Sequence, residues 1–170
     1  MKWTHLVSKK WFFILMGIAL VFTCSCRNSF YDDDSVYGSG VVVEEIREVD
    51  SFHSVEILGS CDLYFVKGAT QELRVITDDN ILPLILTWVR YDGTLIIESK
   101  GSYTSSVGIK VYVSMVEIRR FAISGSGECR IHVEDVLNVV IAGSGNVYYK
   151  GFPSVVNTTI IGSGDVIHLG

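Results

Sequence analysis

The chain has 170 residues and a formal net charge of −5, with 48% hydrophobic and only 19% charged residues. This length suits one folded domain with a core of its own, and the composition excludes a disordered chain. Because 14 basic residues stand against 19 acidic ones, no positive excess is available to neutralise phosphates, and we expect no nucleic-acid partner.

The first 26 residues have the pattern of an export signal. Lys2, Lys9 and Lys10 precede a charge-free apolar run over 11–23, which leads to Cys24-Ser25-Cys26. As a helix this run would be about 20 Å long, shorter than the roughly 30 Å core of a bilayer. The pattern therefore favours a signal peptide over a permanent transmembrane helix.

Small residues before a cysteine resemble the lipobox of bacterial lipoproteins. Ser25 fits the position before a lipidated Cys26 better than Thr23 fits the position before Cys24, which remains the alternative. We therefore predict a signal peptide at 1–25 and a lipid anchor at Cys26 that holds the protein on the outer membrane. Without residues 1–25 the net charge is −8. The pattern leaves open whether the protein faces the periplasm or the cell surface.

Residues 26–40 contain Asp32-Asp33-Asp34 with Ser and Gly, and they show no apolar period. Such a segment is typical of a solvated tether. The alternative is that the acidic run is a sorting signal for display on the outer leaflet.

From Val41 onward the sequence predicts an all-β domain, 41–170. Short runs rich in β-branched and aromatic residues are separated by Gly, Asp, Asn or Ser. The expected strands are 41–43, 54–58, 63–66, 73–76, 95–98, 109–113 and 119–123. The one helical candidate is 79–89, which we expect to be a short helix or a turn.

An internal repeat dominates the second half of the chain. The block Gly-Ser-Gly occurs at 125–127, 143–145 and 162–164, and a degenerate copy, Gly-Ser-Cys, occurs at 59–61. The last three copies are 18 and 19 residues apart, which predicts a β-solenoid or right-handed β-helix-like stack with one coil per copy. The glycines would allow tight corners with positive φ.

Aligning the copies gives three columns. We expect two apolar columns to lie inside the stack and one polar column to lie outside, beside the corner. The columns are Ile57, Ile123, Ile141 and Ile160; Leu63, Cys129, Val147 and Val166; and Asp62, Glu128, Asn146 and Asp165.

These repeated blocks, together with the segments 47–55 and 92–97, resemble the putative auto-transporter adhesin head GIN domain family over roughly 41–170. The resemblance implies an exported envelope protein of Gram-negative bacteria, a β-helix-like fold and a role in adhesion. It brings no catalytic or ligand-binding residues, so none is assigned. Members of this family continue with further coils, so an uncapped last coil near Gly170 could expose an edge that pairs with a second chain. Whether Gly170 is the natural end of the solenoid stays open.

Two classes of function remain. The first is a non-enzymatic module whose β surface and tyrosines, such as Tyr64, Tyr103 and Tyr148, bind a glycan or an envelope protein. The second is a polysaccharide-acting lyase or hydrolase, whose candidate residues are Asp62, Glu128, Asp165 and Arg130. These are too regularly spaced to indicate one active site, and we favour the module and no enzyme.

The sequence predicts no cofactor and no metal site. A calcium β-roll needs acidic Gly-rich blocks every nine residues, twice as often as here. His53, His132 and His168 are scattered, and no two have metal-ligand spacing. Cys61 and Cys129 fall at different repeat positions, which favours free thiols over a disulfide.

Overall fold

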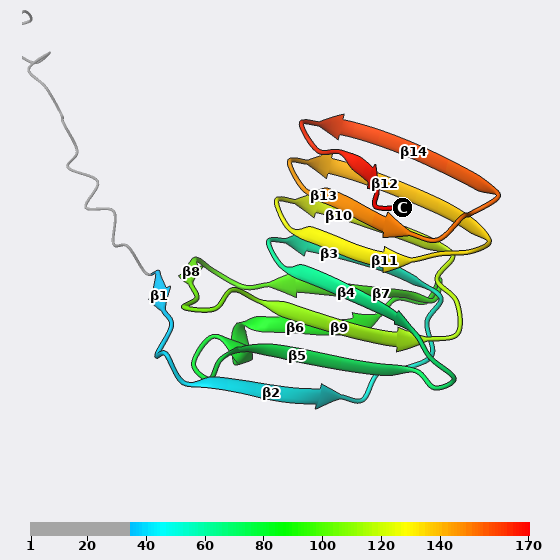
Figure 1. Ribbon diagram of the computed structural model, residues 1–170. Coiled ribbons are helices and arrows are strands. Elements are labelled where there is room, and N and C mark those ends of the chain that lie inside the picture. The colour runs from blue at the N-terminus through cyan, green and yellow to red at the C-terminus, as the bar shows by residue number, and fades with distance from the viewer. Residues whose placement is uncertain (1–34) are drawn as a thin grey trace, which may run out of the picture. The chain divides into compact units, whose positions relative to one another are not determined.

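The computed structural model describes residues 35–170, which form one compact all-β unit. The all-β prediction is confirmed. The predicted lipid attachment at Cys26, its alternative Cys24 and the signal peptide lie outside the described residues. Figure 1 shows the strands, whose bounds are β1 Val36–Tyr37, β2 Val42–Arg47, β3 Ser54–Gly59, β4 Asp62–Lys67, β5 Glu72–Asp78, β6 Ile85–Val89, β7 Thr94–Ser99, β8 Tyr103–Thr104, β9 Lys110–Met115, β10 Arg120–Gly125, β11 Glu128–His132, β12 Val136–Gly143, β13 Asn146–Lys150, β14 Val155–Gly162 and β15 Val166–His168.

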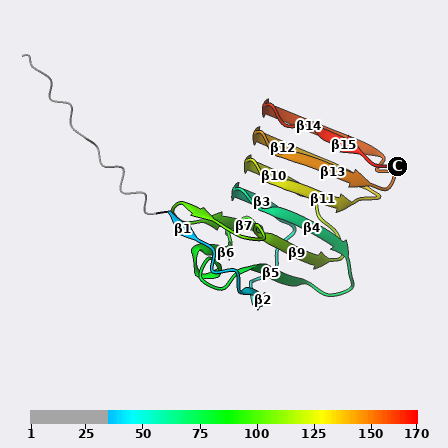
Figure 2. The ribbon, with the colours of Figure 1, turned by 60° about the vertical axis from the view of Figure 1, so that its left-hand side comes forward.

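Two mixed sheets enclose the core. One has six strands in the order β14-β12-β10-β3-β7-β6, and the other has seven in the order β15-β13-β11-β4-β9-β5-β2. From β10 onward the chain alternates between the sheets, and from β12 onward each strand pairs in parallel with the strand two before it, as Figure 2 shows. Alternate side chains from both sheets therefore meet in one apolar interior.

The two predicted apolar columns are confirmed as in-register rows. Ile123 pairs with Ile57 on one side and Ile141 on the other, and Ile141 pairs with Ile160. In the facing sheet the second column, Leu63, Cys129, Val147 and Val166, is likewise aligned. These side chains are almost fully buried until the last strands, where Ile160 is 41% exposed.

The Gly-Ser-Gly corners lie one over another. Gly125, Gly143 and Gly162 have φ of 151°, 136° and 137°, a backbone region that residues other than glycine rarely adopt. A Cβ on Gly143 would also clash with the carbonyl oxygen of Gly125. That same carbonyl accepts hydrogen bonds from the amides of Ser144 and Gly145, each at 3.0 Å. Glycine is thus required because the backbones of successive corners touch.

The prediction of a short helix or a turn at 79–89 holds for its first half and is wrong for the second. Residues 79–81 form a turn and a 3₁₀ turn, η1, covers Leu82–Leu84, whereas residues 85–89 are strand β6. Ile85 is buried and pairs with Ser99, while Trp88 pairs with Ile96. The β-branched and aromatic residues after Pro83 gain more from antiparallel pairing with β7 than from continuing the turn.

The region before the repeats also contains antiparallel pairs, which a regular stack would not have. Strand β5 runs antiparallel to both β2 and β9, and β6 runs antiparallel to β7. The corner at Gly59 is paired with the next one, Gly125, across 66 residues of chain. The intervening strands extend both sheets beneath that corner (Figure 1).

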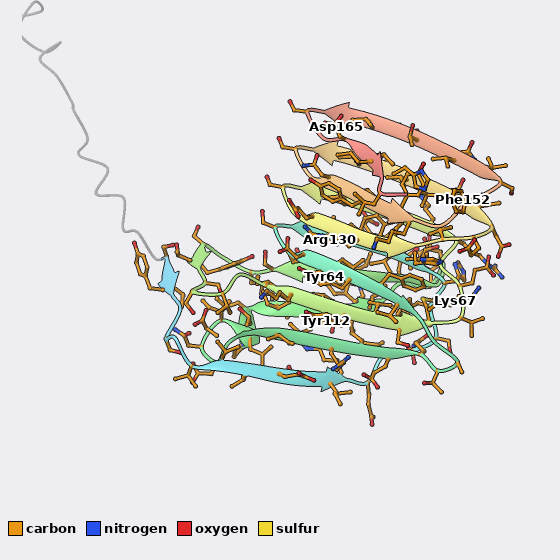
Figure 3. All side chains as sticks on the ribbon, in the orientation of Figure 1. Tyr64, Lys67, Tyr112, Arg130, Phe152 and Asp165 are labelled. Carbon is orange, nitrogen blue, oxygen red and sulfur yellow. The ribbon has the colours of Figure 1, made fainter. Side chains whose placement is uncertain are left out.

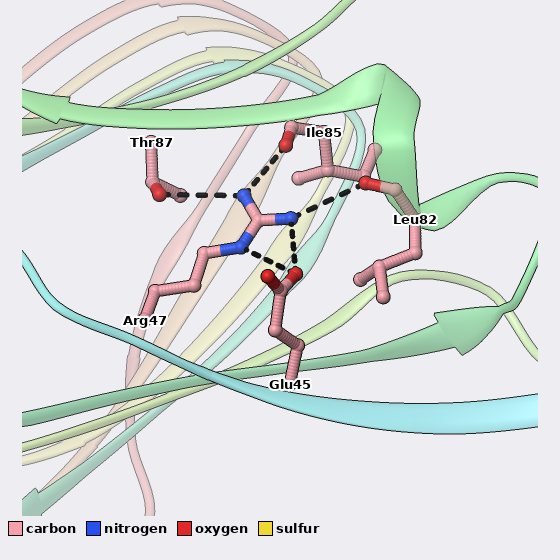
Figure 4. A network of polar contacts seen from close by, with 5 residues as sticks. All are labelled: Glu45, Arg47, Leu82, Ile85 and Thr87. Carbon is pink, nitrogen blue, oxygen red and sulfur yellow. Dashed lines mark hydrogen bonds and ion pairs between the residues drawn. The ribbon is translucent and has the colours of Figure 1, made fainter.

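Arg47 clamps the edge strand β2 to the opposite sheet. Its guanidinium donates hydrogen bonds to the carbonyl oxygens of Ile85 and Leu82, at 2.5 and 3.2 Å, and to Thr87 Oγ1 at 3.3 Å, as Figure 4 shows. Glu45 pairs with the same guanidinium, with its Oε2 3.0 Å from Nη2 of Arg47. Arg47 therefore closes the end of the core at strand β2.

Asp78 is a fully buried carboxylate that holds the first residues of the described chain. Its oxygens accept hydrogen bonds from the Ser105 hydroxyl, from the Ser106 hydroxyl and amide, and from the Gly40 amide. These donors stabilise the charged form and keep the pKa of Asp78 far below its usual range. Beside it, β1 pairs with β8, so residues 36–40 lie against the folded domain rather than apart from it.

Candidate binding surface

One row of side chains crosses the outer face of the seven-stranded sheet. Each of the seven strands contributes one residue, and neighbours in the row are directly paired across strands. In β4, β5, β9 and β11 the neighbours of these residues along the strand, such as Leu63 and Phe65 beside Tyr64, are buried. We call this set the aromatic row; it consists of Ile46, Arg74, Tyr112, Tyr64, Arg130, Tyr148 and Ile167.

Stacking holds the row together. The rings of Tyr64 and Tyr112 are 4.8 Å apart between centroids, with 15° between their planes. The Arg130 guanidinium lies 5.7 Å from the Tyr64 ring and 5.4 Å from the Tyr148 ring, and Arg74 lies 5.6 Å from Tyr112. Cation–π contacts at such exposed sites contribute about 0.5–1 kcal/mol each. Figure 3 shows Tyr112, Tyr64 and Arg130 in succession up the sheet.

Arg130 is also paired with Glu128, whose carboxylate lies 2.7 Å from Nη2. Partial burial acts to lower the pKa of Arg130, but the combined attraction of Glu128, Tyr64 and Asp62 outweighs burial and raises it. The side chain therefore stays a cation at any pH the protein meets.

A shallow hollow of about 280 Å³ runs beside the aromatic row. It crosses strands β9, β4, β11 and β13, and it has an apolar floor with cations at its margin. Its lining residues are Tyr64, Phe65, Val66, Tyr112, Arg130, Ile131, His132, Tyr148, Lys150 and Leu169.

The predicted polar column lies at the corner and has a structural role. Asp62 Oδ1 accepts a hydrogen bond from the Glu128 amide at 3.3 Å, and Asn146 Oδ1 accepts one from the Asp165 amide at 2.9 Å. Asp62 therefore joins its corner to that of Glu128, and Asn146 joins its corner to that of Asp165, while Glu128 accepts a hydrogen bond from Arg130. Within residues 35–170, no three His, Cys, Asp or Glu side chains are grouped so that they could hold a metal ion.

The structure places two of the three predicted tyrosines in the aromatic row and the third outside it. Tyr64 and Tyr148 belong to the aromatic row, whereas Tyr103 lies on β8, where its hydroxyl is 3.4 Å from the Ser60 carbonyl oxygen. Sequence reasoning missed Tyr112 and Arg74. Both alternate with buried residues in their strands, and this alternation was the available signal for their outward position.

The other predicted histidines and cysteines each have separate contacts and form no common site. His132 is bonded to Glu134 at 2.6 Å, which lowers the pKa of Glu134, and His168 stacks on Tyr149. Cys61 and Cys129 are free and buried, as predicted. Burial raises the pKa of the Cys61 thiol to about 12, so the thiol is unreactive.

The family model described as "putative auto-transporter adhesin, head GIN domain" matches residues 51–170, well over half of the chain. This chain belongs to that family. The resemblance given by its sequence is thereby confirmed. The adhesin-like description of this family suggests an exported or cell-surface protein. In residues 35–170 the structure has no helix long and apolar enough to cross a membrane.

Solved structures similar to this head GIN domain come from several bacteria. A putative adhesin from Bacteroides fragilis NCTC 9343 has 11% identity and a TM-score of 0.46, covering 79% of this chain and 100% of its own. A putative lipid binding protein from Parabacteroides distasonis ATCC 8503 has 15% identity and a TM-score of 0.43, with 80% and 100% coverage. A putative cell adhesion protein from Clostridium sporogenes ATCC 15579 has 14% identity and a TM-score of 0.44, with 75% and 98% coverage. No curated protein matches the chain.

Proposed function

We propose that this protein is a non-enzymatic binding module of the cell envelope, which presents the aromatic row to a glycan or protein partner. The observation that carries the proposal is the row itself. Seven outward side chains are fixed by cross-strand pairing, and Tyr and Arg, the residue types richest in binding energy at interfaces, occupy its centre.

A comparison of two tyrosine variants tests the role of the row. The full chain, purified in detergent, is applied to an array of neutral and acidic glycans and to immobilised mucin. Tyr64→Ser with Tyr148→Ser should abolish the binding seen with the unaltered chain. Tyr91→Ser is the control, because Tyr91 is 100% exposed and lies outside the row. Binding that survives the double substitution contradicts the proposal.

The scaffold under this surface is, in our proposal, a short β-solenoid with corners 18 and 19 residues apart. Support comes from the parallel in-register pairs that join β10 to β12, β12 to β14, and β11 to β13. Such a scaffold repeats its outer positions at the strand spacing of about 4.8 Å, which suits an extended partner.

Attachment to the outer membrane through lipid on Cys26, or on Cys24, completes the proposal and rests on the sequence pattern alone. Replacing both cysteines by serine should move the protein out of the membrane fraction and remove labelling by a tagged fatty acid. A protein that stays in the membrane fraction would contradict this anchor. Protease added to intact cells then distinguishes surface display, where the domain is cut, from a periplasmic position.

The enzyme alternative finds less support in the side chains that could carry it. Asp62 accepts a corner amide and Arg130 is paired with Glu128, so both have structural partners. Release of new reducing ends or unsaturated sugars from the polysaccharides on the array would restore that alternative.

Self-association through the last strands is the remaining part of the proposal. Strand β14 is an edge strand with eight residues and no charge, and it exposes Val155, Val156, Ile160 and Ile161. Uncharged edges favour pairing with another strand. A second copy of this chain, added edge to edge, would cover them. Ile161→Lys should then turn dimers into monomers in sedimentation, whereas Val116→Lys should not; monomers at every concentration of the unaltered chain would refute it.

A further inference from the structure

We propose that the hollow beside the aromatic row binds a glycan that carries carboxylate groups. This inference rests on the proposed function and names the ligand class.

The charge of the hollow is opposite to that of the whole chain. Arg130, His132 and Lys150 are in its lining, which contains no Asp or Glu, although the chain has 19 acidic residues and a net charge of −5. A basic concavity attracts anions, whereas the acidic remainder of the protein surface repels them. The nearest acids are Glu128 and Glu134, which pair with Arg130 and His132. Lys150 has no ion-pair partner among residues 35–170, so it is the cation of the lining whose charge is not offset.

The rings are turned so that they do not offer their faces to a ligand. Coplanar rings cannot approach to 4.8 Å between centroids, so the nearly parallel Tyr64 and Tyr112 overlap face to face. Arg130 lies over the other face of Tyr64 and over one face of Tyr148, and Arg74 lies over the other face of Tyr112. What remains for solvent is the row of ring edges and hydroxyls.

This orientation favours an anion over a neutral sugar. Neutral sugars bind aromatic residues by stacking their apolar side on a free ring face, which Tyr64 and Tyr112 at the centre of the row lack. The edge of an aromatic ring is the positive part of its quadrupole, and a tyrosine hydroxyl donates a hydrogen bond. Ring edges, hydroxyls and cations therefore all favour a negatively charged ligand.

Donors remain available at the margin of the hollow. Arg130 uses Nη2 for Glu128, and a guanidinium has five N–H donors arranged to meet a carboxylate with two of them. Lys150 forms no ion pair with any of residues 35–170, and it is paired across strands with His132. The hollow spans four strands, or about 14 Å, which is room for a short stretch of an extended sugar chain.

Binding of polygalacturonate to the full chain, measured by calorimetry, tests the proposal. Its fully methyl-esterified form is the neutral match, and dextran sulfate tests whether sulfate can replace carboxylate. We expect binding of polygalacturonate that weakens as salt is raised, and at least about tenfold weaker binding of the ester and of dextran sulfate.

A pair of double variants assigns this binding to the hollow. Arg130→Gln with Lys150→Gln should weaken binding of polygalacturonate about tenfold or more. Arg119→Gln with Lys100→Gln removes the same two charges from exposed positions outside the hollow and should change affinity less than twofold. Melting curves of all variants show whether each is folded.

The outcomes separate this inference from the proposed function. If the methyl ester binds as tightly as the acid, or dextran sulfate binds more tightly, the ligand class is wrong while a binding role for the row stands. If both double variants lose binding equally, the hollow is not the site. If the tyrosine double variant of the previous section also leaves every interaction unchanged, the proposed function fails as well.

Discussion

The upper part of the two sheets, residues 120–168, and the lower part, residues 36–119, are held together by different kinds of contact. In residues 120–168, successive corners touch through backbone atoms, with Gly143 against the Gly125 carbonyl and Gly162 against that of Gly143. In residues 36–119, polar side chains make the closures, with Arg47 joining the sheets and Asp78 holding the start of the described chain. The upper part therefore depends on the absence of side chains, and the lower part depends on their charge.

The largest expected effect is from a methyl group added at a corner. Gly143→Ala places a Cβ against the Gly125 carbonyl in a region of φ that alanine avoids, so we expect a loss of about 3–5 kcal/mol in the free energy of unfolding. Gly101→Ala is the matched control, with φ of 71° and no atom within 4 Å of the added Cβ. It should cost only about 1–2 kcal/mol. Equal losses in urea unfolding would mean that corner contact is unimportant.

A smaller effect is expected along the apolar column as it leaves the core. Ile141→Ala removes a fully buried side chain and should cost about 3 kcal/mol, whereas Ile160→Ala, at 41% exposure in a single chain, should cost less than about 1 kcal/mol at dilutions where the protein is monomeric. Urea unfolding of both variants measures the difference. At concentrations where the proposed dimer forms, β14 is covered and the loss for Ile160→Ala should be larger; a loss that does not change with concentration would contradict self-association through β14.

The third effect is specific to the lower part and depends on pH. The pKa of Asp78 is lowered by Ser105, then by Ser106 and Gly40, so its stabilisation is complete above the unfolded value of about 3.9 and declines as the pH falls toward the folded pKa. Asp78→Asn should lower the melting temperature at pH 7 by on the order of 5 °C and flatten its decline between about pH 4 and pH 2. Asp79→Asn, an exposed neighbour, should leave both nearly unchanged. An unaltered acid profile in Asp78→Asn would assign the acid response to other carboxylates.

The upper part could be predicted from sequence because its spacing is regular. Equivalent residues recur after 18 or 19 positions, so pairs such as Cys129 with Val147 follow from alignment of the copies. The lower part has no such period. Tyr112 meets Tyr64 on one side and Arg74 on the other only because β9 inserts between β4 and β5 in the sheet, a pairing that no local pattern encodes.

The candidate site shows the same division. Tyr64, Arg130 and Tyr148 stand at one repeat position, and two of them were singled out as exposed tyrosines. The basic residues of the hollow follow the same rule, because His132 and Lys150 come two positions after Arg130 and Tyr148 and pair at the repeat spacing. Tyr112 and Arg74 do not, since their place in the row depends on strands β9 and β5, which have no repeat.

Closure of the corners by backbone atoms also bears on how such a protein can diversify. Since the carbonyl and amide groups that join Gly125 to Ser144 and Gly145 are common to all residues, duplication of a single coil would lengthen both sheets without disturbing the coils already present. The outward positions of each duplicate would then be free to change while its glycines and inward residues stay fixed. One inherited framework could in this way acquire many recognition surfaces, each differing only in the side chains that point to solvent.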